Sequence, residues 1–199
     1  MNIADKLTFF RLYAVPFFVL FFSIDTGNPG LSGDYLKIAA AVLFILGAIS
    51  DGMDGYYARK YKIVTSSGKL WDPVADKILV SSALILLTSY DYIPAYVVIL
   101  IIAREFFISG VRLVSIERGN LMSASKLGKW KTGFQLGYII TILVFICFEI
   151  LIIDYCSGNY YSDLFLTNKI YIIKTLEIIT VFFTVFSGYN YFKQNRENL

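Results

Sequence analysis

Long apolar segments dominate this sequence, and they constrain its fold more than any other feature. Hydrophobic residues make up 57% of the 199 residues and charged residues only 17%. The core of a soluble domain of this length could not bury so many apolar side chains. A helix needs about 20 mainly apolar residues to cross the hydrocarbon layer of a bilayer. Six segments meet that requirement, at about 8–24, 37–59, 71–90, 93–114, 130–153 and 169–191. The sequence therefore predicts one all-α domain over residues 1–199, a polytopic membrane protein with six transmembrane helices, in place of a soluble globule, a nucleic-acid-binding domain or a disordered chain.

The chain contains no histidine and only two cysteines, Cys147 and Cys156. Without histidine, the sequence excludes histidine acid–base chemistry, histidine-ligated zinc and a Ser-His-Asp triad. The two cysteines are nine residues apart, which matches neither a redox motif nor a disulfide framework.

The Lys and Arg residues are distributed unevenly along the chain. An even number of spans puts both termini on one side, and all but three of the 18 Lys and Arg residues fall on that side; the exceptions are Lys37, Lys169 and Lys174. Cytoplasmic loops carry an excess of Lys and Arg. We therefore expect a protein of the cell membrane (inner or plasma membrane). Both termini and the 59–70 and 112–131 loops should face the cytoplasm.

Four aspartates stand where the second span ends and the third begins. Asp51 and Asp54 are three residues apart, and Asp72 and Asp76 are four apart, so each pair shares one helix face. The loop between the spans is short, which predicts antiparallel neighbours and convergence of the four carboxylates near the cytoplasmic ends. Such carboxylates repel each other unless cations neutralise them. An all-oxygen ligand set favours Mg²⁺ or Mn²⁺, and four aspartates can hold two ions.

Simpler interpretations of the individual aspartates remain open. Asp72 precedes a proline and can be a helix N-cap, while Asp51 with Arg59 and Asp76 with Lys77 can be plain ion pairs. A different class of function, a small cation transporter that uses the cluster as its ion site, also fits intramembrane carboxylates. The position of the cluster at one end of the helices, away from the midplane, argues against a transporter.

The pattern around the aspartates resembles the signature of the CDP-alcohol phosphotransferase family. It reads Asp51-x-x-Asp54-Gly55-x-x-Ala58-Arg59, then eight residues, then Gly68-x-x-x-Asp72-x-x-x-Asp76. Members are six-helix membrane enzymes, usually homodimers, that move a phosphatidyl or related group from a CDP-linked donor to an alcohol and release CMP. The resemblance implies two divalent cations, Mg²⁺ or Mn²⁺, bound by Asp51, Asp54, Asp72 and Asp76, with Asp76 as the general base.

The same signature implies a site for the CDP-linked donor at Asp54, Gly55, Arg59 and Gly68. Glycine allows close approach of a ligand to the backbone, and the guanidinium fork of Arg59 suits a phosphate. Helix packing for the two glycines, and an interface anchor or salt bridge for Arg59, are the alternatives.

Later segments resemble the bacterial phosphatidylglycerophosphate synthases within that family. They are Ala103-Arg104-Glu105-Phe106, Gly110-Val111-Arg112-Leu113, Lys126-Leu127-Gly128-Lys129-Trp130-Lys131-Thr132 with Gln135, and Ser187-Gly188-Tyr189-Asn190-Tyr191-Phe192. This resemblance implies CDP-diacylglycerol as the donor, anchored in the lipid bilayer, and sn-glycerol 3-phosphate as the acceptor. The dianionic acceptor needs cations, for which the candidates are Arg104, Arg112, Lys129 and Lys131. The alternatives are a pairing of Arg104 with Glu105 or another helix, and a sister enzyme that acts on serine or inositol phosphate.

The N-terminal segment fits the same resemblance through Leu7-Thr8-Phe9-Phe10-Arg11. It departs at Ala4 and Asp5, where that group often has Pro and Asn. The departure affects expectations for ligand contacts by this segment and leaves the expected metal site unchanged.

Overall fold

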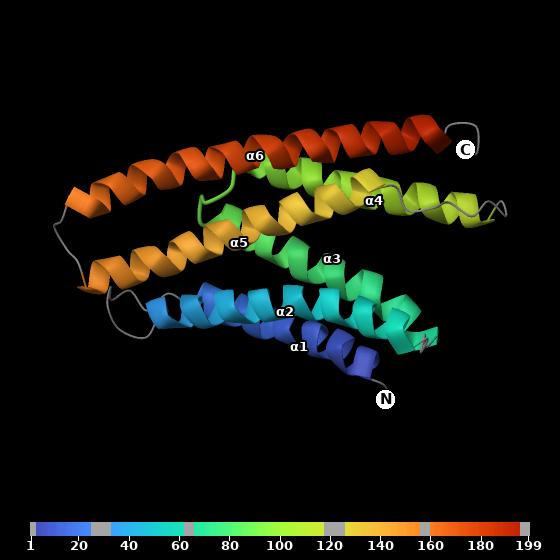
Figure 1. Cartoon of the computed structure of the whole chain (residues 1–199), viewed down its shortest axis with the longest axis horizontal. Coiled ribbons are helices and arrows are strands. Elements are labelled where there is room, and N and C mark those ends of the chain that lie inside the picture. Colours follow the sequence, from blue (N-terminus) through green and yellow to red (C-terminus); the bar gives the residue numbers. More distant parts are fainter. Residues whose placement is uncertain (1–2, 25–32, 62–65, 118–125, 156–159, 196–199) are drawn as a thin grey trace.

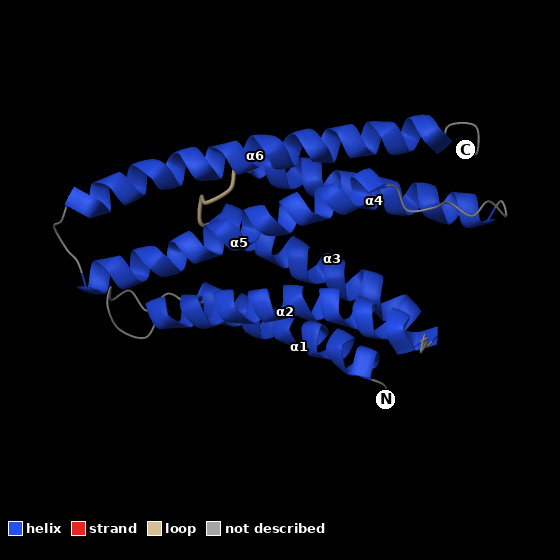
Figure 2. Ribbon diagram, viewed as in Figure 1, coloured by secondary structure: helices blue, strands red, loops and turns tan. Residues whose placement is uncertain are grey.

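Helices make up nearly all of the structure, a computed structural model that describes residues 3–24, 33–61, 66–117, 126–155 and 160–195 (Figures 1 and 2). Across these ranges there are six helices and no strand, which confirms the all-α prediction. The helices are α1 (Ile3–Ser23), α2 (Gly33–Tyr61), α3 (Ser66–Ser89), α4 (Ala95–Glu117), α5 (Lys126–Tyr155) and α6 (Tyr160–Asn195).

The helices extend beyond the predicted spans, most of all α6, which has 36 residues and begins at Tyr160. Hydropathy detects only the part of a helix that suits the hydrocarbon layer, whereas the helix itself can continue into the polar interface. Within the part of the chain that the structure describes, four helices are long and apolar enough to cross a membrane, through Lys6–Ser23, Asp34–Gly52, Trp130–Leu151 and Asn168–Lys193. By length and composition, α1, α2, α5 and α6 therefore agree with four of the six predicted spans. Helices α3 and α4 have comparable lengths of 24 and 23 residues, and they carry the charged residues of the candidate site.

The helices run back and forth along the long axis of the molecule (Figure 1). Helix α1 packs against α2 and α3, while α6 packs against both α4 and α5. Contacts between α2 and α5 join these two groups of three. The start of α1, the end of α2, the start of α3 and the end of α6 all lie toward the right of Figure 1. The topology thus brings the predicted aspartate segments and both ends of the chain to the same end of the bundle.

A tight contact between α2 and α3 lies next to the aspartates. A Cβ atom on Gly47 would stand 3.0 Å from Cδ2 of Leu79, which is fully buried. Real Cβ atoms rarely come this close to another heavy atom, so glycine permits the close approach of the two helices here. Asp51 follows Gly47 by one helical turn, and this approach therefore sets the spacing of the site.

A polar cluster around Glu177 joins α4, α5 and α6. Glu177 of α6 is buried and accepts hydrogen bonds from the hydroxyls of Tyr96 in α4, at 2.7 Å, and of Tyr138 in α5, at 3.5 Å. Lys174, one turn earlier in α6, forms an ion pair with the same carboxylate at 3.0 Å. A buried carboxylate is tolerated within apolar helices when it is paired in this way. The cluster fixes these three helices relative to one another.

Candidate active site

An ion pair between a buried arginine and a partly exposed aspartate connects α1 to the aspartate segment of α2. Nη1 of Arg11 lies 2.9 Å from Oδ1 of Asp51, and the side chain of Arg11 is 0% exposed whereas that of Asp51 is 40% exposed. The methylene stem of Arg11 passes Gly47, where its Cγ would lie 3.8 Å from an added Cβ. A buried guanidinium requires an anionic partner. Arg11 therefore holds one oxygen of the carboxylate while the rest of Asp51 remains accessible.

Asp76 lies in α3, and its charge interacts with that of Asp51 in α2. Arg11, Glu105 and Lys131 also lie within electrostatic reach of Asp76. Two of the four predicted carboxylates therefore lie close together, next to both positive and negative groups. The neighbouring Lys77 donates a hydrogen bond to Oγ of Ser109 at 2.5 Å, and among the described side chains no ion pair joins Lys77 to Asp76.

The other predicted ligands, Asp54 and Asp72, lie in α2 and α3, but their side chains are outside the described residues. Helical spacing places Asp54 on the face of Asp51, and Asp72 on the face of Asp76. Because α3 begins at Ser66, Asp72 lies inside the helix, and its interpretation as an N-cap is wrong. Among the described side chains, no three Asp, Glu, Cys or His residues converge. The four-aspartate metal site stays a prediction; the oxygen donors Asp51 and Asp76, on neighbouring helices, fit a hard divalent cation.

For the signature residues expected to bind the donor, the structure gives only the helix in which each one lies. Gly55 and Arg59 fall in α2, and Gly68 falls in the first turn of α3. Their surroundings lie outside the described residues, as does the side chain of Lys129 in α5. Asp51 contacts Arg11, and its alternative pairing with Arg59 stays a prediction, because the side chain of Arg59 lies outside the described residues.

A cavity of about 610 Å³ opens between α3, α4 and α5, with a contribution from α6. Its polar wall includes charged residues from two helices, namely Asp76, Lys77, Arg104, Glu105 and Arg112. Its apolar wall is formed mainly by Val80, Leu84, Ile101, Ile102, Ile108 and Leu136. A ligand in this cavity would therefore meet the carboxylates of Asp76 and Glu105, the ammonium group of Lys77 and two guanidinium groups, together with hydrocarbon side chains.

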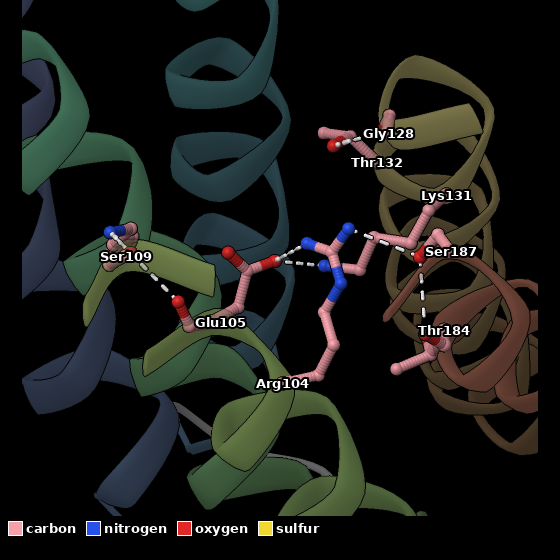
Figure 3. A network of polar contacts seen from close by, with 9 residues as sticks. Arg104, Glu105, Ser109, Gly128, Lys131, Thr132, Thr184 and Ser187 are labelled. Atoms are coloured by element: carbon pink, nitrogen blue, oxygen red, sulfur yellow. Dashed lines mark hydrogen bonds and ion pairs between the residues drawn. The ribbon is translucent and has the colours of Figure 1, made fainter. Parts of the chain in front are cut away.

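The carboxylate of Glu105 contacts two cations, Lys131 and Arg104 (Figure 3). Nζ of Lys131 donates to Oε1 of Glu105, and Nη1 of Arg104 lies 3.7 Å from the same oxygen. Nη2 of Arg104 donates to Oγ of Ser187 at 3.1 Å, so the guanidinium also bridges to α6. At Gly188 an added Cβ would lie 3.4 Å from Cγ of Arg104, which shows how closely the arginine stem approaches α6. The alternative pairing of Arg104 with Glu105 is thus present alongside its position on the cavity wall.

The three predicted acceptor-binding cations whose side chains the structure describes fall into different environments. Arg104 and Arg112 both line the cavity. Lys131 is 1% exposed and directs its ammonium group at Glu105. Nε of Arg104 is buried and has no hydrogen-bond partner among the described residues. An anionic ligand in the cavity would therefore find an open donor on Arg104.

Two charged residues of this site, Arg11 and Glu105, were absent from the sequence-based set. From the sequence, Arg11 is expected only as one of the charges on the cytoplasmic side, and Glu105 only as a local partner of Arg104. A signal was present, because each is an ionisable residue in an apolar helix, and such residues usually mark functional positions. Their partners depend on which helices pack together, and spacing along one helix does not determine that.

Comparisons with known proteins give a consistent result over almost the whole chain. The sequence profile of the CDP-alcohol phosphatidyltransferase family matches residues 1–186. The chain is 38% identical over 204 residues to the CDP-diacylglycerol–glycerol-3-phosphate 3-phosphatidyltransferase of Bacillus subtilis (strain 168), covering 100% of this chain and 97% of that protein. It is 35% identical over 196 residues to the protein of the same name from Rickettsia typhi, covering 96% of each. A third protein of this name, from Wigglesworthia glossinidia brevipalpis, is 38% identical over 150 residues, which is 72% of this chain and 77% of the relative.

Proposed function

Because the chain belongs to the CDP-alcohol phosphatidyltransferase family, we propose that it transfers the phosphatidyl group of CDP-diacylglycerol to sn-glycerol 3-phosphate. The products are phosphatidylglycerophosphate and CMP, as part of phospholipid biosynthesis. The names of the relatives support this choice of donor and acceptor. The structural observation that carries the proposal is the shared cavity wall, on which Asp76 stands with Arg104 and Arg112.

The chemistry proposed for this wall is a single displacement at phosphorus. Asp76 accepts the proton of an acceptor hydroxyl, whose oxygen forms a bond to the β-phosphorus of the donor. The bond from that phosphorus to the oxygen of CMP breaks, and its electron pair leaves with CMP. The apolar wall of the cavity excludes water, which would otherwise compete with the acceptor for the phosphatidyl group.

Two divalent cations, Mg²⁺ or Mn²⁺, complete the proposed site. Asp51, Asp54, Asp72 and Asp76 would hold them, since hard cations prefer carboxylate oxygens. When bound, they supply positive charge to the pyrophosphate of the donor and to the departing CMP. Arg11 has a separate role, because its ion pair with Asp51 keeps that carboxylate oriented within the site.

The donor is proposed to bind at the aspartate end of α2 and α3. Asp54, Gly55, Arg59 and Gly68, the signature residues in these helices, would contact its nucleotide and pyrophosphate. A guanidinium at Arg59 can donate two parallel hydrogen bonds to a phosphate. The acyl chains of the donor can remain in the bilayer during the reaction.

The acceptor is proposed to bind in the cavity. Arg104 has a buried Nε without a partner among the described residues, and Arg112 lines the same wall. These two residues would contact the acceptor phosphate, together with Lys129 at the start of α5. Lys131 would contribute its charge through Glu105, to which it is bound.

We place this active site at the cytoplasmic face of the cell membrane, with both termini on that side. The Lys and Arg distribution supports this orientation, and the common end of the bundle that holds the aspartate segments agrees with it. A homodimer is the assembly expected from the family resemblance.

An acceptor panel tests the proposed function directly. Purified protein is given CDP-diacylglycerol with glycerol 3-phosphate, serine, inositol phosphate or free glycerol, and CMP release is measured. Of the four acceptors, we expect only glycerol 3-phosphate to support turnover. A chelator should abolish this turnover, and added Mg²⁺ or Mn²⁺ should restore it. Preference for serine or inositol phosphate would indicate a sister enzyme, and full activity after chelation would exclude the two-cation site.

A further inference from the structure

One polar side chain on the cavity wall has no role in the chemistry proposed above. Gln135 of α5 lines the cavity and is 3% exposed. Its Oε1 atom is buried and accepts no hydrogen bond from any residue that the structure describes. An amide oxygen that is buried without a donor is costly and uncommon in proteins. The position therefore suits a hydrogen-bond donor that arrives with a ligand.

The nearest polar groups on the same helix are already engaged. Gln135 follows Lys131 by four residues and Thr132 by three, so all three lie on adjoining positions of one helix face. Lys131 donates to Glu105, and the hydroxyl of Thr132 donates to the carbonyl oxygen of Gly128 at 3.1 Å. Neither group donates a hydrogen bond to the amide oxygen of Gln135.

The proposed acceptor carries a donor of the required kind. Glycerol 3-phosphate has two hydroxyl groups, of which one reacts and transfers its proton to Asp76. Its phosphate matches the open Nε of Arg104, another cavity-lining residue. The second hydroxyl would otherwise face apolar residues of the cavity lining, such as Leu84 and Ile101. A hydroxyl enclosed in this way needs an acceptor.

We propose that Oε1 of Gln135 accepts a hydrogen bond from the non-reacting hydroxyl of the acceptor alcohol. This inference rests on the proposed function and extends it, because it assigns a residue to the choice between the two hydroxyls. With the phosphate held at Arg104 and the C2 hydroxyl held at Gln135, the terminal hydroxyl is the one left to reach Asp76. A site that binds a substrate hydroxyl also discriminates strongly against an analogue that lacks it.

The test compares glycerol 3-phosphate with 3-hydroxypropyl phosphate, which lacks the C2 hydroxyl. In the unmodified protein we expect kcat/KM to be about ten- to a hundredfold higher for glycerol 3-phosphate. In Gln135→Met, kcat/KM for glycerol 3-phosphate should fall by about that factor and the preference should largely disappear. Gln135→Asn, whose shorter side chain withdraws the amide, is a second variant with the same expected loss of preference.

Thr132→Val is the matched control, since it changes a cavity-lining residue of the same helix whose hydroxyl is already bonded to Gly128. It should keep the preference for glycerol 3-phosphate. Both acceptors are measured on one preparation of each variant, so a reduced fraction of folded protein does not alter the ratio.

Unchanged preference in both Gln135 variants, or an equal loss in Thr132→Val, would overturn the assignment while leaving the proposed function intact. Absence of turnover with glycerol 3-phosphate in the unmodified protein would instead refute the proposed function, and this inference with it.

Discussion

The guanidinium of Arg11 and the carboxylate of Asp51 lie 2.9 Å apart, in a pair whose cation is completely buried and whose anion is partly open. Because of this asymmetry, Arg11 contacts Asp51 from the interior of the bundle, and the exposed part of the Asp51 carboxylate remains available to a ligand. It also makes α1 a part of the candidate active site, even though the predicted ligands belong to α2 and α3.

Replacement of Arg11 by alanine should destabilise the protein. Breaking a fully buried ion pair costs about 3–5 kcal/mol, and because Asp51 is partly exposed we expect about 3 kcal/mol. Arg11→Lys should retain part of the stability, since it keeps the charge and loses the planar fork. Thermal unfolding of the detergent-solubilised protein measures the effect. Lys6→Ala, which removes an exposed cation from the same helix, is the control, and equal losses in Lys6→Ala and Arg11→Ala would contradict the special role of the pair.

The aspartate variants should separate catalysis from stability. We expect Asp51→Asn, Asp54→Asn, Asp72→Asn and Asp76→Asn each to lose nearly all turnover, by about 10²–10⁴-fold for a general base at Asp76. Without added metal, Asp76→Asn should be at least as stable as the unmodified protein, because it relieves repulsion with Asp51. Asp51→Asn should be less stable, because it removes the negative charge that lies 2.9 Å from the buried Arg11.

CMP release and thermal unfolding are measured on the same four preparations. Two variants with normal turnover would show that the carboxylates are structural. A metal-free Asp51→Asn protein as stable as Asp76→Asn would refute the proposed dependence of Arg11 on Asp51.

The apolar segments and the helical spacing of the aspartates were sufficient to predict much of the architecture. Length and hydropathy predicted six helices, and the three- and four-residue intervals placed each pair of aspartates on one face. These are properties of a single helix, so the sequence contains them directly. The helix ends were less accurate: the prediction began the last helix at residue 169, nine residues after its actual start at Tyr160. Polar and aromatic residues outside the hydrocarbon layer can be helical without raising hydropathy.

The pairing of charges between helices could not be predicted in the same way. Arg11 meets Asp51 because α1 packs on α2. Likewise, Lys131 meets Glu105 because α5 brings its ammonium group to the cavity wall of α4. The sequence shows that each of these residues is costly in an apolar helix, but it does not identify the partner. The roles of Arg11, Glu105 and Gln135 therefore emerged from the structure.

Gly47→Val should disturb the contact between α2 and α3. The added side chain would meet Cδ2 of Leu79 at 3.0 Å and approach the stem of Arg11. Overpacking of this kind costs about 1–3 kcal/mol, and the forced separation should also lower turnover by shifting Asp51 relative to Asp76. Gly137→Val in α5 is the control, since a Cβ there meets nothing within 4 Å. Thermal unfolding and CMP release are measured for both, and equal behaviour would disprove the importance of the close contact.

Glu105→Gln should destabilise the protein by leaving the ammonium group of Lys131 buried without an anion. The loss expected for a broken buried pair is about 3–5 kcal/mol. The double variant Glu105→Gln with Lys131→Met removes both charges and should recover most of this stability. If these residues organise Arg104 for the acceptor phosphate, the double variant should still show an elevated KM for glycerol 3-phosphate and a nearly unchanged KM for CDP-diacylglycerol. Full recovery of both constants would show that the pair is only structural.

The orientation in the membrane is predicted from the charge asymmetry and can be tested by cysteine labelling. On a background in which Cys147 and Cys156 are replaced, single cysteines are introduced at Lys62 and Asn120, in the loops expected to be cytoplasmic, and at Ser89. Ser89 is exposed at the end of α3, which is the opposite end from the aspartate segment.

A membrane-impermeant maleimide added to intact cells should label only the cysteine at position 89. After the cells are permeabilised, positions 62 and 120 should react as well, because the positive-inside bias places these loops in the cytoplasm. Labelling of position 62 or 120 in intact cells would reverse the orientation. It would place the carboxylates, and with them the headgroup chemistry, on the side of the membrane away from cytoplasmic glycerol 3-phosphate.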